Sequence, residues 1–209
     1  MFKGIAGSEG IGIGRVVIIE EHEAVIEDKT ITDVDAEIQR VQSAIEKFVN
    51  VTTEMADKME ATVGAKDADI LRGHIMLLRD PTIEEQIVAL IRSEKVTAEK
   101  ALDQVLEQTA ELFAQIPDEL LQQRATDFRD IKTRIVKILL GIEELDISAV
   151  PAGTVLVAKD LTPSMTAGIV PENIAGVLTE VGGRTSHSAI LARAMEIPAV
   201  LSIEGICSQ

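Results

Sequence analysis

Aromatic side chains are scarce in this sequence: they make up 2% of its 209 residues, and both Trp and Tyr are absent. Because bases and sugars bind largely by stacking on aromatic rings, this scarcity argues against nucleic-acid recognition. The net charge of −15 argues the same way, since a phosphate backbone is bound by clustered Lys and Arg. The sequence therefore predicts no nucleic-acid ligand, and its acidity favours a basic protein partner.

Cysteine and long apolar runs are also scarce. Cys207 is the one cysteine, so no internal disulfide can form. The first ten residues, "MFKGIAGSEG", lack the cationic start and apolar run of a signal peptide. No stretch approaches the roughly 18–20 apolar residues that a membrane span requires. We therefore expect a cytoplasmic protein without membrane insertion.

Apolar residues make up 46% of the chain, enough for one or two aliphatic cores. Residues 11–20, "IGIGRVVIIE", combine a glycine-rich entry with a β-branched run, which predicts a short buried strand. From residue 32 the spacing becomes helical, with apolar residues and one threonine recurring every three or four positions. These residues are Val34, Ile38, Val41, Ile45, Phe48, Thr52, Met55 and Met59.

Further helices are predicted up to Gly141. The segment "DADILRGHIMLLRD" reads as a helix that Pro81 ends, and Thr82 with Glu85 reads as a capping box that opens a short helix. Residues 97–116 and 118–140 form two longer amphipathic patterns, the second closed by Gly141. Together these segments predict a helical bundle.

After Gly141 the pattern alternates strand, strand, helix and strand, which is typical of an α/β fold. An isolated amino-terminal strand cannot bury itself, so it is expected to join this later sheet. We predict a discontinuous α/β domain of residues 1–20 and 145–209. An α-helical domain of residues 32–143 is predicted as an insertion.

The segment "VLTEVGGRTSHSAILARAME" is predicted to run from a strand through a Gly-Gly turn into a helix that begins near His187. Unpaired N–H groups at a helix start favour an anion, and Gly182 and Gly183 allow its close approach to the backbone. Arg184 offers donors to a tetrahedral oxyanion, and the hydroxyls of residues 185, 186 and 188 add more. A neutral imidazole at that place is a nucleophile suited to a covalent phosphohistidine.

Interpretations without phosphoryl chemistry compete with this hypothesis. A lone histidine in a Ser/Thr-rich turn is more often a capping residue, but the Gly-Gly-Arg context favours phosphoryl chemistry. The glycines of "GIGIG" resemble a dinucleotide loop, yet they lead into a strand instead of a helix, which argues against that fold. No second histidine, cysteine or carboxylate cluster near His187 suggests a metal site.

The segments "GGRTSHSAILAR", "LTPSMTA" and "GHIMLLRDP" together resemble Enzyme I of the bacterial phosphoenolpyruvate:sugar phosphotransferase system. The histidine motif alone is also similar to the swivelling domains of phosphoenolpyruvate synthase and pyruvate phosphate dikinase. The inserted helices with "GHIMLL" and "RATDFRDI" favour Enzyme I. A third alternative is a helical interaction module without catalysis.

The resemblance implies that His187 takes a phosphoryl group from phosphoenolpyruvate and passes it to the carrier protein HPr. It implies that Thr166 hydrogen-bonds this histidine, within a site that also contains Gly182, Gly183, Arg184, Thr185 and Ser186. The helical insertion is implied to bind HPr through residues of three predicted helices. These are His74, Met76, Leu77, Ile83, Leu120, Leu121, Arg124 and Arg129.

In the family, a carboxyl-terminal barrel binds phosphoenolpyruvate and Mg²⁺ and mediates dimerisation. The resemblance implies that these 209 residues form an amino-terminal piece that binds no metal or cofactor itself. It also implies that the sheet of the α/β domain is shortened at its carboxyl end. It further implies a monomer for this piece and a homodimer for the full-length enzyme.

Overall fold

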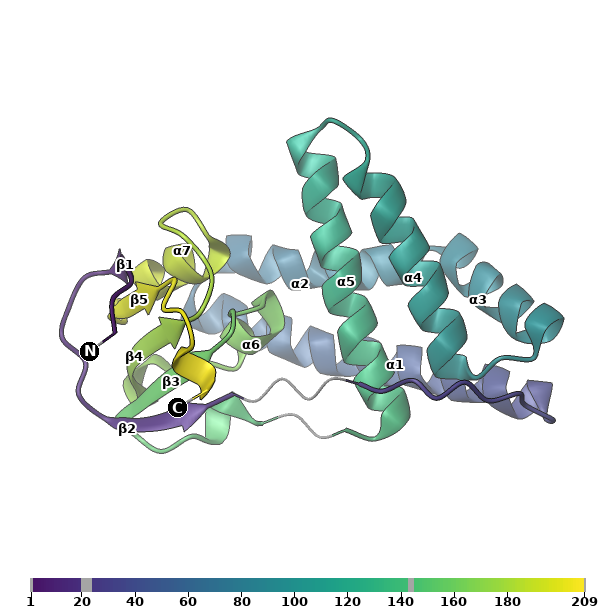
Figure 1. Cartoon of the computed structure of the whole chain (residues 1–209), viewed down its shortest axis with the longest axis horizontal. Coiled ribbons are helices and arrows are strands. Elements are labelled where there is room, and N and C mark those ends of the chain that lie inside the picture. The colour runs from purple at the N-terminus through teal and green to yellow at the C-terminus, as the bar shows by residue number, and fades with distance from the viewer. Residues whose placement is uncertain (1, 20–23, 143–144, 209) are drawn as a thin grey trace. The chain divides into compact units, whose positions relative to one another are not determined.

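The computed structural model describes residues 2–19, 24–142 and 145–208, and Figure 1 shows its mixed sheet and its helices. The expected domain limits at residues 1, 20, 143 and 209 lie outside the described residues. The strands are β1 (Ile5–Ser8), β2 (Arg15–Ile18), β3 (Thr154–Ala158), β4 (Ile174–Thr179) and β5 (Ala199–Leu201). The α-helices are α1 (Val34–Thr62), α2 (Ala65–Leu78), α3 (Pro81–Glu94), α4 (Ala98–Ala114), α5 (Glu119–Leu140), α6 (Pro163–Ala167) and α7 (His187–Ala194). The 3₁₀ helices are η1 (Ile147–Ala149), η2 (Pro171–Asn173) and η3 (Ile206–Ser208).

The chain divides into two compact units. One comprises Met1–His22, Met55–Ile70 and Glu144–Gln209, and the other comprises Glu23–Glu54 and Leu71–Glu143. The first unit contains the sheet with α6 and α7, and the second contains α3, α4, α5 and parts of α1 and α2. The end of α1 and the start of α2 thus group with the α/β residues, whereas the sequence pattern assigned both to the insertion.

The sheet has the strand order β1-β5-β4-β3-β2. Strands β2, β3, β4 and β5 are parallel, and β1 pairs antiparallel with β5. The amino-terminal residues therefore supply both edge strands of a sheet whose centre comes from the end of the chain. This confirms the prediction that the first residues join the later α/β elements.

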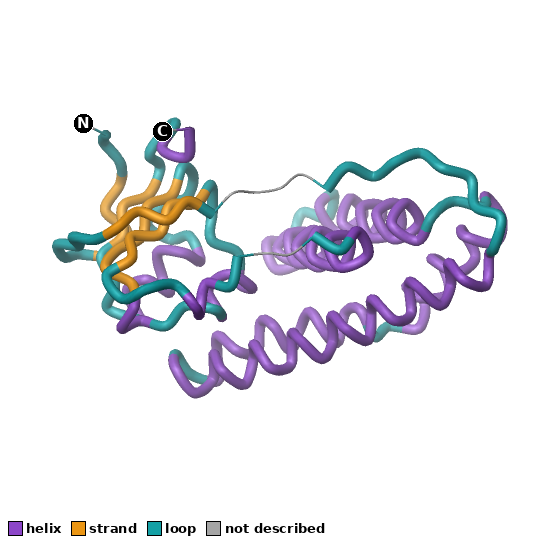
Figure 2. Tube along the Cα trace, turned by 90° about the horizontal axis from the view of Figure 1, so that it is seen from below, coloured by secondary structure: helices purple, strands orange, loops and turns teal. Residues whose placement is uncertain are grey.

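The two faces of the sheet follow from the alternation of side chains along each strand. Leu156 and Val177 lie on the face that packs with α7, whereas their neighbours Val157 and Leu178 lie on the face that packs with η3. Figure 2 shows the short helices on one side of the strands and the carboxyl-terminal turn on the other. Both faces are covered, so the central strands are apolar on both sides.

The prediction of a buried strand at residues 11–20 is wrong in part. Strand β2 is an edge strand with Val16 exposed, and the segment before it leaves Ile11 and Ile13 90% and 87% exposed. Ile19 is buried in the core, while Val17 and Ile18 are half-buried against it. An apolar run cannot reveal whether its strand is central or at an edge, because pairing partners decide this.

The helical unit confirms the predicted amphipathic face of α1. Val41, Phe48 and Thr52 of this face are fully buried, and none of its eight members is exposed. Helices α4 and α5 lie side by side, as Figure 1 shows, and one apolar core joins residues of α1, α3, α4 and α5. The core lacks Trp and Tyr, as the composition required.

Local capping explains where the helices begin and end. Gly141 adopts a left-handed conformation (φ 66°) and closes α5, and the side chains of Thr97 and Asp118 cap α4 and α5. The predicted capping box of Thr82 and Glu85 is wrong. Asp80 caps α3 instead, because its carboxylate accepts from the Thr82 backbone N–H at 2.9 Å while Pro81 occupies the first turn. This hydrogen bond holds the pKa of Asp80 below its usual range.

Among the helices built from described residues, none is both long enough and apolar enough to cross a membrane.

The connection between β1 and β2 depends on two glycines. A Cβ at Gly12 would lie 2.0 Å from the Ala175 carbonyl oxygen, and one at Gly14 would lie 2.0 Å from the Gly153 carbonyl oxygen. Gly12→Ala should therefore lower the thermal unfolding midpoint, as followed by circular dichroism, because backbone must move to admit the methyl group. Gly73→Ala is the matched control, since Gly73 lies within α2, where alanine is favoured by about 0.5–1 kcal/mol. An unchanged midpoint for Gly12→Ala would contradict the close approach.

Candidate functional site

The carboxyl edge of the sheet collects three segments of the α/β unit. Parallel strands β3, β4 and β5 end at this edge, and the loops after β3 and β4 open α6 and α7. The two short helices contact each other. In open parallel sheets, ligands bind outside the carboxyl ends of the strands. The topology thus brings "LTPSMTA" and "GGRTSH" to one edge.

His187 is the first residue of α7, as its sequence context predicted. Ser186 is the N-cap, and its Oγ accepts from the Ala189 N–H at 3.3 Å and lies 2.9 Å from the Ser188 Oγ. His187 is half-buried, whereas Ser188 is buried beneath it. The first-turn N–H groups of a helix have no partner within the helix, so this end of α7 carries positive potential.

The glycines before the helix allow the loop to turn tightly. Gly182 has φ 107°, a conformation that strongly favours glycine, and a Cβ there would lie 3.3 Å from the Ser186 Oγ. Gly183 has open space around its Cα and accepts the Ser186 N–H at 2.9 Å. The side chains of Arg184 and Thr185 are exposed. Six of the predicted site residues, from Gly182 to His187, therefore form one continuous turn at the sheet edge.

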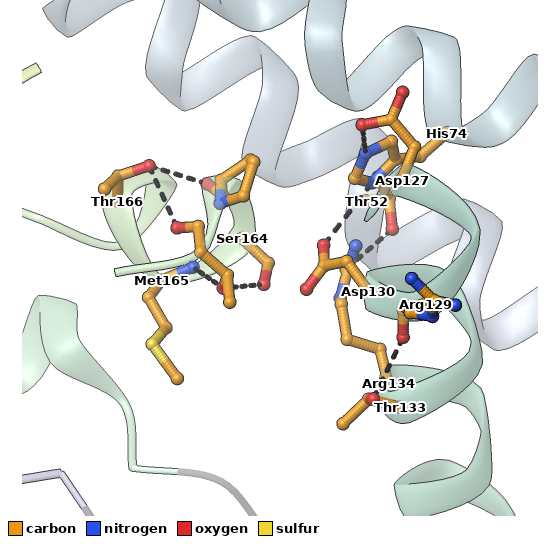
Figure 3. Close-up of polar contacts among 12 residues, drawn as sticks. Thr52, His74, Asp127, Arg129, Asp130, Thr133, Arg134, Ser164, Met165 and Thr166 are labelled. Atoms are coloured by element: carbon orange, nitrogen blue, oxygen red, sulfur yellow. Dashed lines mark hydrogen bonds and ion pairs between the residues drawn. The ribbon is translucent and has the colours of Figure 1, made fainter. Parts of the chain in front are cut away.

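Thr166 lies in α6 and is buried, and Figure 3 shows its hydroxyl directed at its own helix. The Oγ donates to the carbonyl oxygens of Pro163 at 2.8 Å and Thr162 at 3.2 Å. A hydroxyl has a single hydrogen, so donation to His187 would require its rotation. In this conformation the hydroxyl of Thr166 can only accept from the imidazole.

The helical unit carries a groove of about 1000 Å³ between α2, α3, α4 and α5. Met76, Leu77, Ile83 and Arg124 line it, as predicted for the partner surface. Met76 is 76% exposed, Leu77 is half-buried and Ile83 is buried. Of these three apolar residues, Met76 is therefore the one that α2 presents to solvent at the groove.

The groove also contains residues that the sequence did not single out. Leu90 of α3 and Leu112 and Phe113 of α4 contribute to its lining. Leu112 is exposed although it lies in an apolar helix pattern. The sequence could not mark it as a groove residue, because the buried face of α4 is known only from the structure. Leu120 and Leu121 lie in the first turn of α5, and neither lines the groove as the structure describes it.

Arg124 and Arg129 differ in how they are held. Arg124 lies 3.4 Å from an Asp127 carboxylate oxygen and lines the groove. Arg129 donates to Glu107 at 2.9 Å, and Lys132 binds the same carboxylate at 2.7 Å. The hydrogen bond from Lys132, followed by that from Arg129, holds the pKa of Glu107 below its usual range. A partner would have to compete with Glu107 for Arg129, whereas Arg124 already faces the groove.

His74 was predicted to contact the partner, but its side chain is fully buried. Its Nε2 lies 3.3 Å from Asp127 and its Nδ1 lies 3.5 Å from Asp130, as Figure 3 shows. His74 therefore binds α2 to α5 and influences the groove through Asp127, which also pairs with Arg124.

Removal of His74 should destabilise the helical unit, because it leaves two nearly buried carboxylates facing an apolar gap. We expect His74→Leu to lower the free energy of unfolding in urea by about 2–3 kcal/mol, as measured by helical circular dichroism. Adding Asp130→Asn should recover part of that loss, since it removes one of the two charges. Equal stability of wild type and His74→Leu would show that the contacts of His74 with Asp127 and Asp130 contribute nothing to the free energy of unfolding.

In the part of the chain that the structure describes, no three His, Cys, Asp or Glu side chains gather into a metal-binding cluster.

Comparisons with known proteins agree with this arrangement. Residues 3–124 match the family model "PEP-utilising enzyme, N-terminal", and residues 150–209 match "PEP-utilising enzyme, mobile domain". A phosphoenolpyruvate-protein phosphotransferase of Mycoplasma capricolum is 40% identical over 204 residues, which cover 98% of this chain and 36% of the relative. That of Haemophilus influenzae is 38% identical over 203 residues, covering 96% and 35%.

A solution NMR structure of an Enzyme I protein superposes with a TM-score of 0.90 at 38% identity. The match covers 100% of this chain and 85% of that one. The chain therefore belongs to the PEP-utilising enzymes and, among these, to the Enzyme I proteins. It spans about a third of the length of the curated relatives that it matches.

Proposed function

We propose that this chain carries the phosphohistidine and the HPr-binding surface of an Enzyme I of the phosphoenolpyruvate:sugar phosphotransferase system. The observation that carries the proposal is the position of His187. It begins α7 at the carboxyl edge of the sheet, directly after a tight glycine turn and an exposed Arg184. In this proposal the first unit is the mobile phosphohistidine domain, and the second is the HPr-binding domain.

The chemistry is phosphoryl transfer through a covalent intermediate. An unprotonated imidazole nitrogen of His187 attacks phosphorus, a P–N bond forms, and the bond from phosphorus to its donor breaks. The positive end of α7 and the guanidinium of Arg184 stabilise the charge on the transferred group. Thr185 and Ser186 offer hydroxyls beside it. Thr166 accepts from the other ring nitrogen, or donates after its hydroxyl rotates.

The donor is phosphoenolpyruvate, and we propose that its binding site lies in the part of the relatives that these 209 residues do not span. Mg²⁺ would be bound there together with the substrate, while this chain would use neither a metal nor a cofactor. The full-length enzyme is proposed to be a cytoplasmic homodimer and the present chain a monomer. These proposals rest on membership of the family, and no contact within this chain carries them.

His187→Ala should abolish phosphate uptake from phosphorylated HPr, because the hydroxyls beside it cannot replace an imidazole nitrogen as nucleophile. Intact-mass measurement after incubation detects the transferred group, which should be labile in acid and stable in base. Arg184→Ala should slow the transfer strongly while leaving HPr affinity unchanged, since its charge is proposed to face the phosphoryl group. Uptake by His187→Ala near the wild-type level would refute the assignment.

Phosphoenolpyruvate with Mg²⁺ serves as the negative control of this experiment. It should leave the 209-residue chain unlabelled, whereas phosphorylated HPr should label it reversibly. Labelling by phosphoenolpyruvate alone would place a substrate site within this chain. Failure of phosphorylated HPr to label a chain that binds HPr would favour an interaction module without catalysis.

HPr is proposed to bind in the groove of the helical unit. A transient partner is suited by a modest apolar patch with charged residues at its rim. Met76, Leu77 and Ile83 supply the apolar patch and Arg124 its rim, while Arg129, Leu120 and Leu121 would extend the surface along α5. His74 contributes by orienting Asp127. The basic surface that an acidic chain attracts is expected on HPr.

Met76→Ala and Leu77→Ala should weaken HPr binding, because both remove apolar surface from the proposed contact. We expect a loss of about 1–2 kcal/mol for Leu77→Ala, roughly five- to thirtyfold in affinity, by titration calorimetry. Val51→Ala is the matched control, since Val51 is an exposed residue of α1 that does not line the groove. Unchanged affinity in folded Met76→Ala and Leu77→Ala variants would move the docking surface elsewhere.

A further inference from the structure

Four successive carbonyl groups in the loop before His187 each accept a hydrogen bond from a different donor. The Thr179 hydroxyl donates to Val181 O at 2.6 Å, and the Ser202 hydroxyl donates to Gly182 O. The Ser186 N–H donates to Gly183 O at 2.9 Å. The guanidinium of Arg193 donates to Arg184 O at 3.0 Å. These donors come from the end of β4, the residue after β5, the N-cap and the last turn of α7.

The geometry of the peptide unit gives this pattern a consequence. In a trans peptide the C=O and the following N–H point in opposite directions. The carbonyls of residues 182, 183 and 184 are each held by a donor, so the N–H groups of Gly183, Arg184 and Thr185 each point away from the donor of the preceding carbonyl. A row of such N–H groups in front of a helix start is suited to an anion.

Arg193 is the donor that joins two separate parts of the fold. Its second nitrogen donates to the carbonyl oxygen of Gly7 at 2.7 Å. Gly7 is the irregular residue of β1, since the register with β5 shifts between Ala6 and Ser8. A bulge re-aims the groups of the bulged strand, and here a β1 carbonyl is directed at the guanidinium.

The surroundings of Arg193 favour a role in positioning the loop. Arg193, Arg184, Glu9 and Glu196 line a cavity of about 500 Å³, yet both described hydrogen bonds of Arg193 go to main-chain carbonyls. Its side chain is exposed, whereas α7 packs on the sheet through buried residues such as Leu191. Loss of the guanidinium should therefore release the loop without removing core contacts.

Ser202 gives the same loop a second attachment. It adopts φ 55°, which is uncommon for a residue with a side chain, and in this conformation its hydroxyl reaches Gly182. The next residue, Ile203, donates its N–H to Thr179 O at 2.9 Å. The segment after β5 is thereby fixed to both ends of the turn that follows β4.

We propose that Arg193 is a positioning residue for phosphoryl transfer: by joining Gly7 O to Arg184 O it turns the N–H group of Thr185 toward the phosphoryl group of His187, beside the N–H groups of Gly183 and Arg184 that the other two donors hold. This inference rests on the proposed function of His187. It assigns Arg193 no contact with the transferred group. Arg193 forms and breaks no covalent bond, so the phosphoryl transfer to His187 needs no further reactant.

The decisive measurement is the ¹H–¹⁵N spectrum of the 209-residue chain before and after phosphorylation by phosphorylated HPr. In the wild-type chain, the amide protons of Gly183, Arg184 and Thr185 should shift downfield when the phosphoryl group accepts their hydrogen bonds. Unshifted amides in a phosphorylated wild-type chain would overturn the proposal without any variant. A wild-type chain that takes up no phosphate would instead refute the proposed function.

Arg193→Met should slow phosphorylation by tenfold or more at unchanged HPr affinity, and the amide shift of Thr185 above all should shrink in the phosphorylated variant. Arg193→Lys keeps the charge and one hydrogen bond, so it should fall between wild type and Arg193→Met. Arg15→Met is the matched control, because Arg15 is an exposed arginine of the same unit at the start of β2. The control Arg15→Met should match wild type in transfer rate and in amide shifts. If Arg193→Met or the milder Arg193→Lys matches this control in both measurements, Arg193 has no positioning role.

Discussion

The parallel pairing of β2 with β3 is the constraint on which the rest of the α/β unit depends. It aligns Arg15–Ile18 with residues 154–157, so the two ends of the chain must meet before the sheet exists. A parallel pair always needs a long connection, and here the helices of the second unit lie within that connection. Once β2, β3, β4 and β5 are parallel, their carboxyl ends share one edge, and the turn before His187 can form only there. Helices α4 and α5, by contrast, follow each other in sequence and pack together without such a closure.

Local patterns predicted the elements whose surroundings lie close in sequence. The three- and four-residue spacing from Val34 to Met59 predicted one buried face of α1, and Gly141 predicted the end of α5. The short strand β1 escaped prediction because "IAGS" has neither a β-branched run nor a clear alternation. The exposure of β2 also escaped, because an edge and a central strand can share one sequence. Asp80 and Thr82 compete for the same N-cap role, and Pro81 in the first turn favours Asp80.

The candidate sites also contain parts that the sequence could predict and parts that it could not. The turn from Gly182 to His187 could be identified from sequence because its glycines, donors and nucleophile are contiguous. The bonds from Arg193 to Gly7 and from Ser202 to Gly182 could not, since each requires the sheet to place its two partners together. The burial of His74 was equally hidden, because the two carboxylates that hold it belong to α5. The groove is built from four helices, and the resemblance named lining residues on α2, α3 and α5 but none on α4.

The groove contains two of the chain's four phenylalanines. Phe113 and Phe128 stack with ring centroids 5.6 Å apart and both line the groove. Since the chain has neither Trp nor Tyr, its near-ultraviolet spectrum comes almost entirely from phenylalanine. A change in the environment of this pair is therefore visible in the vibrational fine structure of the phenylalanine bands, without any introduced label. A tryptophan or tyrosine on a bound protein would fluoresce against a nearly dark background. Binding of such a protein in the groove can therefore be followed by its own fluorescence.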